Sequence, residues 1–325
     1  MLRGTLNFNK MRYLLIISLL AFLSSCTKEV KIDIPGYEKQ LVVDGQISTG
    51  TPPFVLLSTT KDIYSPTDLQ SYLNGFVSGA KVTVNNGNKT VELIEVCSDN
   101  LPPGSEDAAA ELFGIPAEDL GNVQICAYAT FDTEMFGEIG KTYTLRIEYE
   151  GKVYTSQTTL KTPVGFVNTF WKTDGQLANH GFSSVTFSDP GNEYNAYFWE
   201  VKRINLDTAG NERDPLFLNT FNPVFNDEFF NGSTFEFAYE NPMSFRDENL
   251  PDRFRGYYER GDSVVIKFSS LDSDVYEYFE KKYVQINNGG SPFSVPANIP
   301  TNIVGGALGV WAGFSTYYDT LYCQD

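Results

Sequence analysis

The stretch Tyr143–Tyr149 (YTLRIEY) alternates apolar and polar side chains, which is the two-residue period of a half-buried strand. The alternation stops at Glu150-Gly151 and resumes in Lys152–Ser156 (KVYTS). Two such runs, joined by a two-residue turn that contains glycine, predict a β-hairpin. We therefore expect this part of the chain to fold as antiparallel sheet.

Shorter runs of the same kind lie on the N-terminal side of the hairpin. Gln40–Ile47 and Phe54–Leu57 are strand candidates, and Gly79–Val84 alternates until it meets an Asn/Gly-rich turn. Because these strands are short and the turns between them close, residues 39–163 are expected to form an immunoglobulin-like or transthyretin-like β-sandwich.

The remainder of the chain, residues 164–325, is expected to form a second β-rich domain. Its clearest strands are 184–187, 196–201, 234–239 and 263–268. One amphipathic helix is predicted near residues 273–287, with the apolar positions Val275, Phe279, Tyr283 and Ile286 on one face. The predicted fold class is therefore mainly β, a sandwich followed by a β-rich domain with one amphipathic helix.

The C-terminal stretch Asn302–Phe314 interleaves glycines with valine, tryptophan and phenylalanine. This pattern predicts a last strand that is closely packed or bulged at its glycines and closes the core. The alternative is an aromatic surface for a partner or ligand, which would comprise Trp311, Phe314, Tyr317 and Tyr318. The sequence leaves both interpretations open.

Two cysteines, Cys97 and Cys126, flank an insertion rich in proline, glycine and acidic residues, with a helical turn predicted at Ser105–Phe113. In an oxidising compartment we expect them to form a disulfide that holds the insertion. The alternative is two unpaired buried thiols. Cys323, near the end of the chain, would be left over.

Residues 1–25 have the organisation of a bacterial secretory signal. Basic residues precede the apolar run Tyr13–Phe22, which is too short for the roughly 20 residues of a transmembrane helix. The run closes on Leu23-Ser24-Ser25-Cys26, where a cysteine indicates the lipoprotein variant. Cys26 would then carry a covalent lipid, the only cofactor that we expect, and residues 26–38 would form a tether. The alternative is an ordinary signal peptide with a chance cysteine.

The charge of the chain excludes some partners. The net charge is −17, and it becomes −20 once the signal, with Arg3, Lys10 and Arg12 and no acidic residue, is removed. Such an acidic surface argues against binding nucleic acid and suits an exported protein or one that recruits cations.

The sequence offers little catalytic equipment. His180 is the one histidine and lies in the turn-like Asn179-His180-Gly181, so a zinc site of several imidazoles is excluded. No Gly-x-Ser-x-Gly nucleophile elbow occurs. Paired carboxylates of a hydrolase are compatible with 41 acidic residues, but this abundance makes any particular pair uninformative. We expect no catalytic residue, no metal site and no enzymatic activity.

Several short motifs follow one another in a recognisable order after the cysteine. They are Ile32-Asp33-Ile34, Leu41–Gly45, Val77–Val84, Gly140–Leu145, Gly261–Val264 and Pro292–Gly313. In these motifs the chain resembles the Bacteroidota outer-membrane lipoproteins catalogued as domain of unknown function 4249, over nearly the whole mature length. Members are typically associated with SusC-like TonB-dependent transporters, so the resemblance implies an accessory or substrate-capturing role and supplies no catalytic residues.

The expected function is a non-enzymatic lipoprotein of the outer membrane that works beside a SusC-like transporter, with an unknown ligand. One alternative is a structural or assembly component of an envelope complex without its own ligand. A third is a carboxylate-dependent hydrolase. Thr27-Lys28-Glu29 partly resembles the surface-export signal of this phylum and departs from it at Val30. We therefore expect the cell surface, and the periplasmic face stays open.

Overall fold

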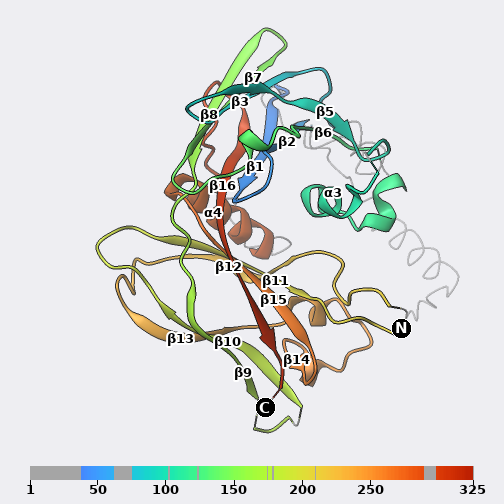
Figure 1. The fold of residues 1–325 in the computed structure, drawn as a ribbon, viewed down its shortest axis with the longest axis vertical. Helices are drawn as coiled ribbons and strands as arrows, with labels where there is room; N and C mark the ends of the chain where they lie inside the picture. Colours follow the sequence, from blue (N-terminus) through green and yellow to red (C-terminus); the bar gives the residue numbers. More distant parts are fainter. Residues whose placement is uncertain are drawn as a thin grey trace, which may run out of the picture. The chain divides into compact units, whose positions relative to one another are not determined.

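The largest element of the fold is an eight-stranded sheet with the strand order β12-β11-β15-β16-β1-β2-β6-β5 (Figure 1). Its strands are β1 (Leu41–Ser48), β2 (Phe54–Thr59), β5 (Ile94–Cys97), β6 (Cys126–Ala129), β11 (Ala196–Arg203), β12 (Leu218–Asn226), β15 (Ser263–Ser270) and β16 (Leu308–Tyr322). The sheet therefore contains strands from both sides of the division predicted at residues 163/164, and Lys39–Asp325 form one compact unit.

The computed structural model describes residues 38–61, 75–101, 103–122, 124–173, 175–177, 179–208, 210–288 and 298–324. The predicted signal, Cys26 and all of the tether except Glu38 lie outside the described residues.

Two four-stranded sheets accompany the large one. The first has the order β4-β3-β7-β8 and consists of β3 (Lys81–Asn85), β4 (Thr90–Glu92), β7 (Thr142–Tyr149) and β8 (Lys152–Thr159). The second has the order β13-β10-β14, with β9 also paired to β10. It consists of β9 (Phe166–Thr173), β10 (His180–Ser188), β13 (Thr234–Tyr239) and β14 (Tyr258–Glu259). The prediction of a mainly β fold with sandwich-like layers is confirmed.

The predicted hairpin is present as β7 and β8. Tyr149 pairs with Lys152, and the two residues between them, Glu150 and Gly151, have φ angles of 47° and 74°. Positive φ at both central positions is the geometry of a type I′ turn, whose twist matches that of the flanking strands. The turn chemistry thus fixes the register of the hairpin.

Helices are few in the described residues. The α-helices are α3 (Glu106–Phe113) and α4 (Ser273–Asn288), and the 3-10 turns are η1 (Ala117–Asn122), η2 (Thr133–Met135), η3 (Pro242–Phe245) and η4 (Asp252–Phe254). The helix predicted near 273–287 is confirmed as α4, with Val275 and Phe279 buried. Ile286, the last of the four apolar positions, is 58% exposed near the end of the helix.

Strand β16 joins the two halves of the large sheet. Residues Leu308–Phe314 pair in parallel with β1, and Ser315–Tyr322 pair antiparallel with β15, so that in Figure 1 the red strand runs beside both. Its odd-numbered residues, such as Trp311 and Leu321, belong to the cores under the two small sheets. Its even-numbered residues Val310, Ala312 and Phe314 pack instead with α4. One strand therefore contributes to three hydrophobic clusters.

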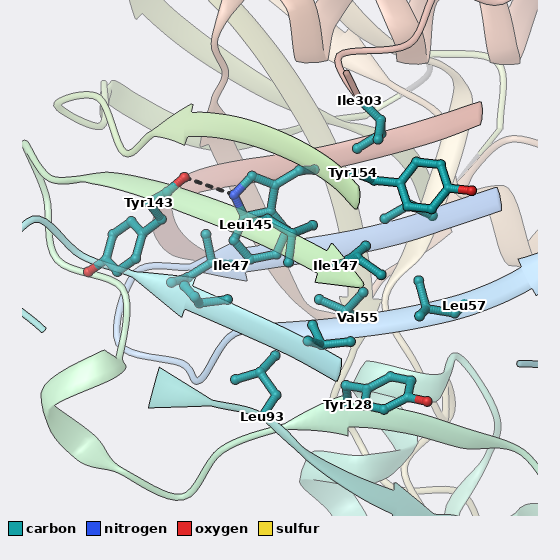
Figure 2. Packing of buried hydrophobic residues seen from close by; sticks show 14 of the residues in the cluster. Ile47, Val55, Leu57, Leu93, Tyr128, Tyr143, Leu145, Ile147, Tyr154 and Ile303 are labelled. Atoms are coloured by element: carbon teal, nitrogen blue, oxygen red, sulfur yellow. Dashed lines mark hydrogen bonds between the residues drawn. The ribbon is translucent and has the colours of Figure 1, made fainter. Parts of the chain in front are cut away.

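The first core lies between the large sheet and β3, β7 and β8, and Figure 2 shows its side chains converging from these strands. Trp311 is fully buried there and donates from Nε1 to the carbonyl oxygen of Tyr143 at 3.0 Å, the dashed line in Figure 2. Gly45 on β1 leaves room for the indole, since a Cβ at that position would lie 2.7 Å from Trp311 Cε3. The ring and the glycine are thus a matched pair across two strands.

The second core, beneath the sheet of β9, β10 and β13, is built largely from aromatic rings. Phe268 packs against Tyr197 with ring centroids 5.0 Å apart and against Phe166 at 4.9 Å. Trp199 is buried in the same cluster. Aromatic side chains bury a large area with few rotatable bonds, so this cluster is expected to carry much of the hydrophobic stabilisation of the C-terminal half.

Cys323 lies in the second core as a free and buried cysteine. Burial raises the pKa of its thiol to about 12, so almost no thiolate exists at pH 8. We predict that a maleimide does not label Cys323 in the native protein and labels it in urea, as measured by mass spectrometry. A Cys323→Ala variant should lose the urea-dependent label. Labelling of native Cys323 within minutes would contradict this assignment.

Candidate functional site

The aromatic surface predicted from the C-terminal sequence is divided between the two faces of β16. Trp311 is fully buried in the first core, so for this residue the structure supports the predicted core strand and contradicts the alternative of an exposed surface. Tyr317 packs edge-on against Phe166, with centroids 5.6 Å apart, on the same face. Phe314 and Tyr318 lie on the opposite face, because successive side chains of a strand point to opposite sides. Only Tyr318 is largely exposed, at 55%.

Phe314 lines a cavity of about 310 Å³, which we call the inter-helix groove. Strands β1, β2, β11, β12, β15 and β16 supply its floor, and α3 and α4 supply its walls. Its aromatic lining comprises Phe54, Phe113, Phe198, Phe279, Tyr283 and Phe314. This face of the sheet is the one that the two small sheets leave open.

Each wall of the groove is held by aromatic contacts with the floor. On α4, Phe279 packs against Phe198 of β11 and Phe314 of β16, with centroids 5.1 and 5.8 Å apart. Phe113 at the end of α3 meets Phe54 of β2 edge-on at 5.3 Å. Because these rings come from elements far apart in sequence, the groove depends on the assembled fold.

A buried ion pair crosses the floor. Lys267 Nζ lies 2.9 Å from Glu200 Oε2 on the neighbouring strand, with the side chains 21% and 15% exposed. Burial lowers the pKa of Lys267, and the Glu200 carboxylate more than offsets this effect, so the pKa lies above its ordinary value. Lys267 is thus a cation whose charge is already engaged within the protein.

A second lysine beside the groove is engaged in the same way. Lys202 Nζ lies 2.9 Å from Glu212 and 3.4 Å from Glu111 on α3. The ring of Phe217 lies close to both ammonium groups, 5.9 Å from that of Lys202 and 5.3 Å from that of Lys267. Neither lysine therefore presents an uncompensated positive charge.

Asp44 of β1 is the exception among the charged groups of the floor. Its side chain is exposed in the groove and has no ion pair or side-chain hydrogen bond with any described residue. Burial and then the negative charge of Asp44 raise the pKa of Tyr278 to about 12. The floor therefore carries one unpaired carboxylate near the tyrosines of α4.

A larger cavity of about 990 Å³, which we call the acidic cavity, adjoins α3 on the side of Lys202. Its carboxylates come from α3, η1 and the loop after β11, and they are Asp107, Glu111, Glu118, Asp207 and Glu212. Glu111 lines both this cavity and the inter-helix groove. The two spaces therefore meet at one side chain.

A separate cleft of about 280 Å³ contains the single histidine. His180 begins β10 instead of lying in a turn, and its ring stacks on Phe254 with centroids 4.4 Å apart. Arg203 and Arg213 also line this cleft, but their guanidinium groups contact buried Asp214 at 2.7 Å and Asp262 at 3.1 Å. These arginines stabilise the loop after β11 more readily than they bind an anion.

Cys97 and Cys126 form a disulfide between β5 and β6, the pairing that the sequence favoured. Within the described parts of the chain, the one set of three side chains close enough to share a metal ion is Glu95 with these two cysteines. The sulfur atoms are bonded to each other, so they offer no thiolate ligands. The disulfide encloses α3 and η1, and so it holds one wall of the groove.

Replacing Cys97 and Cys126 together by serine is expected to lower the free energy of unfolding by about 3 kcal/mol, because the cross-link closes a loop with a sequence separation of 29. Urea denaturation measures the loss, and limited proteolysis should show new cleavage between residues 98 and 125. Reductant should reproduce the effect in the wild type and leave the double variant unchanged. Equal urea midpoints of wild type and variant would contradict the prediction.

The groove residues Asp44, Glu200 and Lys267 were missed at the sequence level. Each is a charged residue that directly follows a run of apolar residues, as in Leu41–Asp44 (LVVD), Ala196–Glu200 (AYFWE) and Val264–Lys267 (VVIK). A charge at such a position indicates an open sheet face, and this signal could have singled out each residue. The sequence does not indicate that the strands of these three residues lie in one sheet and form the floor of one groove.

The family described as "Domain of unknown function (DUF4249)" matches residues 27–317. The chain belongs to the DUF4249 family. No curated protein matches it. A solved structure of a mutant Salmonella alpha-2-macroglobulin matches at 8% identity with a TM-score of 0.20, over 92% of the DUF4249 chain and 16% of that protein. The chain thus spans a small part of the macroglobulin, and this likeness carries no argument about fold or function.

None of the helices in the described part of the DUF4249 protein is long and apolar enough to cross a membrane.

Proposed function

We propose that this DUF4249 protein is a non-enzymatic lipoprotein of the outer membrane that captures a ligand for a SusC-like TonB-dependent transporter. The observation that carries the proposal is the inter-helix groove, a cavity with an aromatic lining and a few charged groups on a sheet floor. Small-molecule sites are typically concave and mostly apolar, with a few placed polar groups. Sites on strands and helices also hold their side chains more precisely than sites on loops.

The assignment to a binding protein is supported by the state of the ionisable groups in the groove. Glu200 is paired with Lys267 within the floor, so this carboxylate serves the structure, whereas Glu111 contacts Lys202 with its side chain still 37% exposed. His180, the one imidazole, lies in a different cleft, one that Arg203 also lines. Capture of a ligand requires only a cavity of complementary shape and charge, and the groove provides such a cavity.

The membrane attachment in this proposal rests on the sequence. In this proposal Cys26, at the end of Leu23-Ser24-Ser25-Cys26, carries the lipid, and residues 26–38 are the predicted tether. Thr27-Lys28-Glu29 favours the cell surface, where a ligand would meet the protein before the transporter.

The test is purification of the full-length tagged lipoprotein from native outer membranes, followed by mass spectrometry of the proteins that accompany it. A SusC-like barrel at near-equal amount is expected, and its repeated absence would overturn the transporter role. A Cys26→Ala variant is expected to leave the membrane fraction. Unchanged membrane retention of this variant would overturn the lipid anchor.

A structural component of an envelope complex is the second candidate, favoured by exposed apolar side chains around β12 and α4. These are Phe221, Phe229, Val284 and Ile286, of which Phe229 is 91% exposed. Apolar patches on soluble surfaces often indicate protein partners. Replacing Phe229 by serine should weaken the complex in this case and leave ligand binding in the groove unchanged.

A further inference from the structure

We propose that the inter-helix groove and the acidic cavity together bind an alkylammonium group, that is, a positively charged amine at the end of a methylene chain. This inference rests on the proposed function and names the class of ligand that the groove would capture. Two sources share this chemistry, a free aliphatic diamine and the lysine side chain of a peptide.

The charge balance of the two spaces favours a cation. Their combined lining contains seven carboxylates and two lysines, and both lysines already contact carboxylates. Asp44 has no charged partner among the described residues. An anionic ligand would meet an excess of negative charge, whereas a cation could form charge-assisted hydrogen bonds with Asp44 at one end and the acidic cavity at the other.

The lining also suits the carbon part of such a ligand. Phe113 and Tyr283 are partly exposed aromatic side chains on opposite walls of the groove. Aromatic rings pack against methylene groups and attract an ammonium group through their π faces. The protein already shows this arrangement internally, where Phe217 lies near the ammonium groups of Lys202 and Lys267.

The arrangement of the carboxylates argues for an organic cation over a metal ion. Within the described residues, no three acidic side chains of the groove or the acidic cavity approach closely enough to share one ion. They are instead divided between two spaces, with Asp44 in the groove, Asp207 in the acidic cavity and Glu111 lining both. Carboxylates that are distributed in this way fit a ligand with several ammonium groups on a flexible chain.

The test is isothermal titration calorimetry of the full-length lipoprotein in neutral detergent at low salt. The probes are 1,5-diaminopentane and tri-lysine, with pentanoate as the anionic counterpart of matched length. We expect at least one of the two amines to bind, with an affinity that falls as salt is added, and pentanoate not to bind. Absence of binding by both amines, or equal binding of pentanoate, would overturn the inference. Binding of only one amine identifies the source.

Substitutions of lining residues test whether the amine binds in the groove. Asp44→Asn keeps the shape of the side chain and should weaken amine binding at least tenfold, and Glu111→Gln should weaken it as well. Glu92→Gln, on the exposed strand β4 of a different sheet, is the matched control and should bind as the wild type does. Thermal melting shows that each variant is folded. If Asp44→Asn and Glu111→Gln each bind the amine with wild-type affinity, the amine does not bind in the groove.

The outcomes separate this inference from the proposed function. A lipoprotein that co-purifies with a SusC-like barrel and binds neither amine keeps its proposed function and loses this ligand class. One that binds amines at Asp44 without any barrel keeps the site and loses the transporter role.

Discussion

Replacing Gly309 by alanine is expected to lower the free energy of unfolding by about 4 kcal/mol, through backbone strain of 1–3 kcal/mol and a steric clash of similar cost. Gly309 has a φ of 100° and pairs with Val43 where β16 runs parallel to β1. A Cβ added there would lie 1.9 Å from the carbonyl oxygen of Val43. The two strands would have to separate, and Trp311, two residues later, would lose its packing against Gly45.

Gly306→Ala is the matched control, because Gly306 also has a positive φ, 88°, but a Cβ there meets no atom within 4 Å. It should cost only the backbone strain, roughly 1–2 kcal/mol. Urea denaturation of both variants separates the clash from the strain. If Gly309→Ala and Gly306→Ala lose the same free energy, the close approach of β1 and β16 is not important for stability.

Local features of the fold could be predicted from the sequence because their causes are local. The hairpin of β7 and β8 follows from alternation and a turn with positive φ at Glu150 and Gly151. The helix α4 follows from the spacing of its apolar residues. Ile286, the last apolar residue of that spacing, is 58% exposed, so the spacing alone does not show where the packing of the helix ends.

The parallel pairing of β1 with β16 could not be predicted in this way. Asp44 and Val310 are paired across the sheet although more than 260 residues separate them, and no local pattern encodes such a contact. The interleaved glycines of the C-terminal stretch did indicate close packing, and Gly309 shows where it occurs. The sequence left open whether Trp311 lies in the core or on a surface. The register of β16 directs its side chain into the first core.

The candidate site, like the pairing of β1 with β16, depends on which strands become neighbours in the fold. Its floor joins Asp44, Glu200 and Lys267 from three strands that become neighbours or near neighbours only through the order β11-β15-β16-β1. The Glu200–Lys267 pair is a direct cross-strand contact, so it depends on register to within one residue. Sequence reasoning could identify charged residues in apolar strands, and strand order determines which of them meet.

Stability is expected to fall steeply above about pH 10, because several tyrosines are buried in the fold. Burial is the largest cause that raises the pKa of each of six tyrosines, namely Tyr197, Tyr239, Tyr258, Tyr276, Tyr278 and Tyr283. For Tyr278 the value reaches about 12. In the unfolded chain these phenols titrate near pH 10, so between about pH 10 and 12 the folded state binds more protons than the unfolded state.

The direction of the change in stability with pH follows from this difference in bound protons. The stabilisation is fully present below about pH 10 and is lost as pH rises through the folded-state pKa values, by up to about 1.4 kcal/mol per pH unit for each tyrosine. Urea denaturation between pH 8 and pH 12 measures the slope. Absorbance at 295 nm should show phenol ionisation rising together with unfolding.

Tyr258→Phe distinguishes this mechanism from general alkaline damage. The Tyr258 side chain is 1% exposed, and its hydroxyl has no hydrogen-bond partner among the described residues, so its removal should cost little at neutral pH. The variant should lose stability less steeply above pH 10, by about one proton's contribution to the slope. Tyr322→Phe, at a 58% exposed position, serves as the comparison. An alkaline slope in Tyr258→Phe equal to that of the wild type would mean that ionisation of this buried phenol does not drive the unfolding.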